Sequence, residues 1–148
     1  MRTPASIAGH PIHPMLVPIA IGGFVISLGA DVIRAASGNP SPWDMLAYYT
    51  MIAGIIGALL AAVPGLIDLL SFPAGGAMRK YALMHMGVNL TVVALYACNA
   101  FLRHGDMQAF NVPFTLSVLA VGLLLVSGWL GGAMVFGAGA GVAEEARK

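Results

Sequence analysis

Three histidines are the side chains of this sequence best suited to chemistry. His10 and His13 lie in the segment GHPIHP, residues 9–14, directly before an apolar run, and His85 lies inside a later run. An imidazole is costly to bury in hydrocarbon, so it needs a metal ion, a haem iron, a carboxylate or a backbone carbonyl as a partner. The three histidines therefore mark the candidate site.

The composition of the chain is that of a membrane protein. Hydrophobic residues make up 59% of the 148 residues and charged residues only 9%, whereas soluble domains average about 25% charged residues. The mean hydropathy is +0.87. A net charge of +1 argues against nucleic acid as a partner. With Cys98 as the sole cysteine, no intramolecular disulfide can form.

Four apolar runs are long enough to cross a bilayer as helices, because a span needs about 20 helical residues. They lie near residues 14–36, 45–70, 81–102 and 112–136. Short Gly- and Pro-rich breaks separate them and force neighbouring helices to run antiparallel. The runs lack the alternation of a transmembrane β-barrel. We predict an all-α integral membrane protein: one transmembrane domain over residues 1–148, folded as an up-down-up-down four-helix bundle.

This topology brings polar residues from separate helices to one face of the membrane. The first helix begins, the second ends and the third begins at that face, so five residues should lie at similar depth. They are His10, His13, Asp68, His85 and Asn89. The spacing His10-x-x-His13 would point both rings the same way in a helix. The alternative is an extended entry, with Pro14 as the first helical residue and His13 as its cap, because Pro11 and Pro14 bias the residue before each away from the helical region.

A polar stripe runs along the third predicted helix and should face the interior of the bundle. Its members, at spacings of 4, 7, 3 and 4, are His85, Asn89, Tyr96, Asn99 and Arg103. We expect Arg103, at the end of this stripe, to extend to the membrane surface.

Small residues predict close helix packing on two helices, within the bundle or between copies of the chain. On the second helix they are Gly54, Ala58, Ala61, Ala62 and Gly65, and on the fourth they are Gly128 and Gly132.

Basic residues in short loops set the orientation. Five lie on the side of the termini: Arg2, Arg79, Lys80, Arg147 and Lys148. Arg34 and Arg103 lie on the other side. We therefore predict a multi-pass protein with both termini in the cytoplasm.

Four interpretations of the histidine layer remain open from the residues alone. It could bind haem through two facing imidazoles, with His13 and His85 as axial ligands. It could bind a transition-metal ion through His10, His13, His85 and Asp68. It could carry protons or small ions, or its side chains could only fasten helix ends. In a haem or metal site, Asp68 or Asn89 would orient a ligating ring.

The ordered motifs of the chain resemble a bacterial four-helix inner-membrane family catalogued as domain of unknown function 2231. They are GHPIHPMLVP (residues 9–18), AVPGLID (62–68), His85-x-x-x-Asn89 and SGWLGG (127–132). The resemblance implies a membrane module that serves redox proteins. It thus favours an electron-transfer subunit with b-type haem, acting with a separate redox protein or with quinone, over a self-contained enzyme. The alternatives are a structural or accessory subunit of a larger complex, a homo-oligomer, or a metal- or proton-handling protein.

Overall fold

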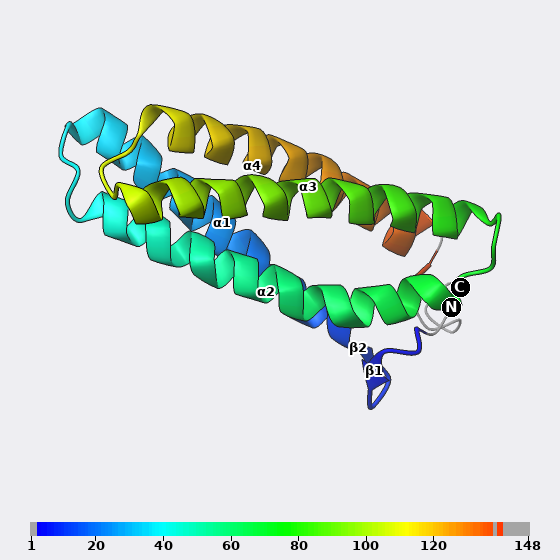
Figure 1. The fold of residues 1–148 in the computed structure, drawn as a ribbon. Helices are drawn as coiled ribbons and strands as arrows, with labels where there is room; N and C mark the ends of the chain where they lie inside the picture. Colours follow the sequence, from blue (N-terminus) through cyan, green and yellow to red (C-terminus); the bar gives the residue numbers. More distant parts are fainter. Residues whose placement is uncertain (1–2, 138, 141–148) are drawn as a thin grey trace.

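Four long helices form the molecule (Figure 1), and the computed structural model describes residues 3–137 and 139–140. The helices are α1 (Ile12–Ser37), α2 (Trp43–Ser71), α3 (Ala77–Gly105) and α4 (Asn111–Gly132), and α4 continues into a π-helical turn, η1 (Ala133–Gly137). All four are long and apolar enough to cross a membrane. The predicted up-down-up-down membrane bundle is confirmed.

The helices extend slightly beyond the apolar runs from which they were predicted. The largest difference is at α3, which begins at Ala77 rather than near residue 81, so Arg79 and Lys80 lie in its first turns. Helical hydrogen bonding can continue past the hydrocarbon boundary, which hydropathy does not reveal. At the other end of the bundle, Gly38 closes α1 in the left-handed conformation (φ 66°) and donates its N–H to the carbonyl of Arg34 at 3.0 Å.

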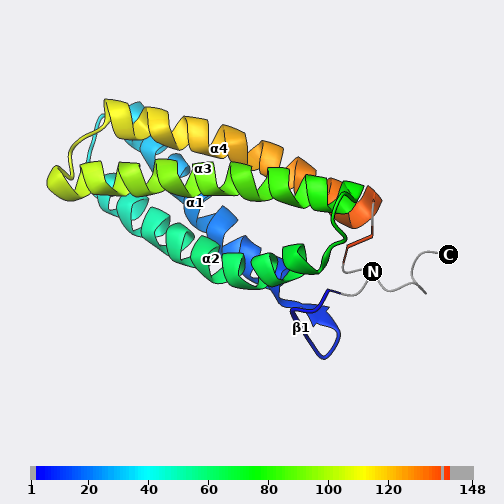
Figure 2. The same cartoon turned by 45° about the vertical axis from the view of Figure 1, so that its right-hand side comes forward.

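A short hairpin precedes α1. Strand β1 (Ser6–Ile7) pairs antiparallel with β2 (His10–Pro11), and Ala8 and Gly9 form the turn with positive φ angles of 50° and 82°. In both cartoon views the hairpin projects from the end of the bundle at which α1 begins (Figures 1 and 2). The chain is extended at His10 and helical from Ile12, so His13 lies inside the first turn of α1. Of the two alternatives for this segment, the one in which His13 caps a helix starting at Pro14 is therefore excluded.

The bundle is assembled from two tightly packed helical hairpins, α1–α2 and α3–α4. Glycines make the α1–α2 contact possible: a Cβ on Gly23 would lie 2.6 Å from the backbone nitrogen of Gly54, and one on Gly54 would lie 2.6 Å from the ring of Phe24. The predicted small-residue face of α2 therefore packs inside the chain, although Ala62 is exposed.

The small-residue face predicted on α4 makes no comparable contact. A Cβ on Gly128 would meet nothing within 4 Å, and one on Gly132 would meet only Phe136 of its own helix, at 4.0 Å. The helix instead approaches α3 through Gly131, where a Cβ would lie 3.5 Å from the ring of His85. Within the described residues, Gly128 therefore does not pack inside the bundle, because the contact falls on another side of α4. The alternative, packing between copies of the chain, stays a prediction.

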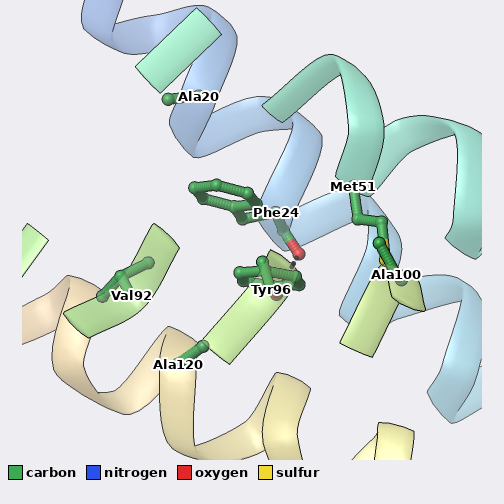
Figure 3. Close-up of a cluster of buried hydrophobic side chains, with 7 residues drawn as sticks. All are labelled: Ala20, Phe24, Met51, Val92, Tyr96, Ala100 and Ala120. Carbon is green, nitrogen blue, oxygen red and sulfur yellow. Dashed lines mark hydrogen bonds between the residues drawn. The ribbon is translucent and has the colours of Figure 1, made fainter. Parts of the chain in front are cut away.

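The parallel helices α1 and α3 contact each other at equivalent positions. The aromatic rings of Phe24 and Tyr96 stack with centroids 4.1 Å apart, and the Tyr96 hydroxyl donates to the carbonyl of Phe24 at 2.9 Å (Figure 3). Three pairs of residues, each separated by 72 positions, meet between the two helices. They are His13 with His85, Phe24 with Tyr96 and Asp31 with Arg103.

Contacts between the helices of each hairpin repeat in the same way. Ser27 of α1 donates to the carbonyl of Ala47 at 2.9 Å, and Asn99, its counterpart on α3, donates to the carbonyl of Pro113 at 2.8 Å. The two hairpins are thus related by an approximate two-fold axis that runs along the bundle between α1 and α3. A ligand bound on this axis would meet one residue from each hairpin.

Candidate functional site

His13 lies in the first turn of α1, and its ring packs against α2. Its Nδ1 lies 2.8 Å from the carbonyl oxygen of Ala61, and the ring covers Gly65, one turn further along α2. A Cβ on Gly65 would lie 2.8 Å from Nδ1. The position of the His13 ring therefore depends on glycine at residue 65.

His85 is held against α4 in the equivalent arrangement. Its Nδ1 lies 2.9 Å from the carbonyl oxygen of Ser127, and its ring passes Gly131, again one turn further along the helix. Ser127 is the counterpart of Ala61, and Gly131 is the counterpart of Gly65. Each hairpin thus presents one imidazole in the same way.

The hydrogen bonds define which ring nitrogen is available for a ligand. A carbonyl oxygen only accepts, so the Nδ1 of His13 must carry the proton that it donates to Ala61. The Nε2 atom then keeps its lone pair, which is the form in which imidazole binds a metal. The same carbonyl bond favours this form in His85. The role that we expected of Asp68 or Asn89, to orient a ring, belongs to two backbone carbonyls.

The two rings approach each other across the axis. Their centroids are 6.2 Å apart and their planes cross at 85°, and both residues are half-buried. Two imidazoles on opposite sides of one metal, with metal–nitrogen distances of about 2.0 Å, have centroids about 6 Å apart. The separation of the His13 and His85 centroids would thus allow both rings to bind one metal ion.

The hydrogen bonds of the other predicted site residues are made with backbone groups rather than with the two imidazole rings. His10 is exposed on β2, with Nδ1 3.1 Å from the carbonyl of Ala8. Asp68 is buried and accepts the backbone N–H of Ala5 at 2.9 Å, so it anchors the segment before the hairpin. Asn89 donates to the carbonyl of His85, one turn earlier in α3, at 2.9 Å. Among the described residues no three His, Cys, Asp or Glu side chains are grouped closely enough to hold a metal ion.

A second polar cluster lies at the opposite end of the bundle and draws on all four helices. The Nη2 atom of Arg103 donates to both carboxylate oxygens of Asp31 at 2.8 Å, and its Nε donates to Asn99 at 2.9 Å. Asn99 in turn donates to the Ser117 hydroxyl of α4 at 2.8 Å. Asp44 of α2 pairs with Arg34 and lies 4.0 Å from the Nη1 atom of Arg103.

Arg103 is fully buried, with an exposed fraction of 0%. The prediction that it extends to the membrane surface was wrong, because its partner Asp31, itself 1% exposed, comes from another helix and cannot be recognised from the sequence of α3. The rest of the predicted stripe faces inward as expected, since Tyr96 and Asn99 are buried and His85 is half-buried. Within the described part of the chain, the Nη1 atom of Arg103 has no hydrogen-bond partner. The Arg103–Asp31 ion pair therefore joins α1 and α3 at this end of the bundle, and the His13 and His85 rings meet at the other end.

Fold and polar layers together define a multi-pass, four-helix membrane protein built from two similar hairpins. The chain belongs to the family described as "Predicted membrane protein (DUF2231)", whose model matches residues 9–144. The match confirms the resemblance seen in the sequence. No curated protein and no solved structure matches the chain.

Proposed function

We propose that this protein is a membrane-embedded electron-transfer subunit that binds a b-type haem between His13 and His85. The observation that carries the proposal is the pair itself: two imidazoles from equivalent positions of two hairpins, 6.2 Å apart between centroids, each with Nδ1 at a backbone carbonyl. Both Nε2 atoms are thereby prepared to act as ligands.

The number of donors favours haem over a bare metal ion. Protein-bound zinc ordinarily takes three or four protein ligands, and no such group occurs among residues 3–137 and 139–140. A haem carries four in-plane nitrogens of its own and needs only two axial ligands, which His13 and His85 can provide. A haem so held supplies reversible one-electron chemistry at its iron.

The residues around the pair would position it rather than react. The carbonyls of Ala61 and Ser127 fix the two rings, and Gly65 leaves the room that the His13 ring occupies. At the far end, Arg103 and Asp31 join the two hairpins through buried charges. This ion pair joins α1 to α3, the two helices that carry the imidazoles.

An electron-transfer subunit of this kind needs a donor and an acceptor. The chain has no Cys-x-x-Cys-His motif, so we propose a separate redox protein or quinone as its partner. We place it in the bacterial inner membrane with both termini in the cytoplasm, which is supported by the five basic residues on the side of the termini.

A structural or accessory role is the second candidate, and one observation favours it. The bonds from His13 to Ala61 and from His85 to Ser127 also join α1 to α2 and α3 to α4. Such interhelical bonds stabilise membrane bundles by about 0.6 kcal/mol each without any ligand.

Absorption spectra of three single variants, produced with added haem, separate these roles. We expect His13→Ala and His85→Ala to lose the six-coordinate haem spectrum. His10→Ala, the matched control on the exposed hairpin, should keep it. A spectrum that survives in both His13→Ala and His85→Ala, or that disappears in His10→Ala, would exclude the assigned ligands.

A further inference from the structure

The two-fold relationship of the hairpins exposes one chemical difference between the two imidazoles. Among residues 3–137 and 139–140, Nδ1 of His13 has a single partner, the Ala61 carbonyl at 2.8 Å. His85 has two, since the hydroxyl oxygen of Ser127 lies 3.1 Å from Nδ1 in addition to the Ser127 carbonyl at 2.9 Å. Ala61, the counterpart of Ser127, has no hydroxyl.

A hydroxyl and a carbonyl differ in what they allow the ring to do. The carbonyl accepts only, so a ring with its lone pair on Nδ1 would face the Ala61 oxygen without a hydrogen bond. The hydroxyl can accept a proton from Nδ1 or donate its own to it. Ser127 is 2% exposed, so water does not replace this group.

We infer that Ser127 is a positioning residue that lets His85 exchange between its two neutral tautomers while its ring stays in place, whereas His13 is confined to the Nδ1–H tautomer. In the exchange, Nε2 takes up one proton from water and Nδ1 releases one to water, so the charge of the ring is unchanged. The Ser127 carbonyl then loses its hydrogen bond, and the Ser127 hydroxyl turns to donate to the emptied Nδ1. A protonated Nε2 cannot bind a metal.

For the proposed function on which this consequence rests, the two ligands differ in what haem binding requires of them. His13 would hold haem through Nε2 in the one tautomer that its carbonyl partner favours. His85 would hold it only in its Nδ1–H tautomer, so haem binding would select that tautomer of His85.

The test uses full-length protein in detergent, without haem, labelled with ¹⁵N in its four histidines. Nitrogen chemical shifts report the tautomer of each ring, and His13→Ala and His85→Ala assign the signals. We expect His13 in one tautomer and His85 in both. Ser127→Ala should reduce the Nε2–H population of His85 about fivefold, the factor typical of losing one hydrogen bond.

The two-fold relationship supplies a reciprocal variant and a control. Ala61→Ser should give His13 the second tautomer, and Ser27→Ala, which removes a buried hydroxyl bonded to Ala47, should change neither ring. Unchanged His85 tautomers in Ser127→Ala, or an equal change in Ser27→Ala, would overturn the inference.

This result is independent of haem binding. If the tautomers differ as expected but no haem is bound, the proposed function fails and the inference about Ser127 stands. If haem binds but each ring holds a single tautomer, the proposed function stands and the inference about Ser127 fails.

Discussion

Asp31 and Arg103 occupy equivalent positions in two similar hairpins and form a buried ion pair where the hairpins meet. The Nη2 atom of Arg103 lies 2.8 Å from both carboxylate oxygens, and neither residue is more than 1% exposed. An approximate two-fold axis thus carries opposite charges at two related positions. One hairpin therefore supplies the acid of the pair, Asp31, and the other hairpin supplies the base, Arg103.

Removal of either charge should destabilise the bundle strongly. We expect Asp31→Asn and Arg103→Gln each to lower the free energy of unfolding by about 3–5 kcal/mol, because each leaves one buried charge without its partner. Denaturant unfolding in detergent measures this. The exchanged pair, Asp31→Arg with Arg103→Asp, should recover part of the loss, since the partners still face each other. A double variant no more stable than the singles would show that Asn99 and Ser117, rather than the ion pair, determine the stability of this cluster.

Adjacent glycines of α1 should respond in opposite ways to alanine. A Cβ on Gly23 would lie 2.6 Å from backbone atoms of α2, whereas one on Gly22 would meet nothing within 4 Å. We expect Gly23→Ala to destabilise the protein by about 1–3 kcal/mol through overpacking. Gly22→Ala should be neutral or stabilising, since alanine favours the helix by up to about 1 kcal/mol. Equal melting temperatures for the two variants would contradict the observed α1–α2 contact.

The glycines beneath the two imidazoles provide a similar comparison. A methyl group at residue 65 would lie 2.8 Å from Nδ1 of His13, while one at residue 131 would lie 3.5 Å from the nearest atom of His85. Gly65→Ala should therefore displace the His13 ring and reduce the fraction of protein that binds haem. Gly131→Ala should bind haem as the natural protein does. Titration of purified variants with haem measures both, and full binding by Gly65→Ala would show that the present position of His13 is not required.

The orientation can be tested with a reporter fused after Lys148. Arg79 and Lys80 lie at the start of α3, as the prediction requires, whereas Arg2, Arg147 and Lys148 lie outside the described residues. Arg103 is buried in an ion pair with Asp31. Of the two basic residues counted on the opposite side of the membrane, only Arg34 then remains. We expect activity from a reporter that works only in the cytoplasm. Activity from one that works only in the periplasm would reverse the topology.

Much of the fold followed from the sequence because the length of each apolar run determines a membrane span. The convergence of His13 and His85 on one layer also followed, since antiparallel topology places the starts of α1 and α3 at the same face. Their contacts did not follow. The rings bond to the backbone carbonyls of Ala61 and Ser127. Every residue has a backbone carbonyl, so the sequence does not indicate which ones act as partners.

The internal repeat escaped sequence analysis for a physical reason. Several counterparts share a place in the bundle rather than a chemical type: phenylalanine faces tyrosine at Phe24 and Tyr96, and an acid faces a base at Asp31 and Arg103. Histidine does recur at residues 13 and 85, but one matching pair is too little to show a repeat in the sequence. The burial of Arg103 was missed for the same reason, because only its counterpart on α1 explains it.

The central claim is that His13 and His85 share one haem, and a quantitative spectrum of the wild-type protein tests it most directly. The protein should be produced with ample haem and iron, purified in detergent, and measured oxidised and after reduction with dithionite, with iron determined by elemental analysis. We expect a Soret band, a low-spin reduced spectrum and one haem iron for each chain. Protein that shows neither Soret absorbance nor stoichiometric metal would contradict the claim and leave the histidines as fastenings between helices.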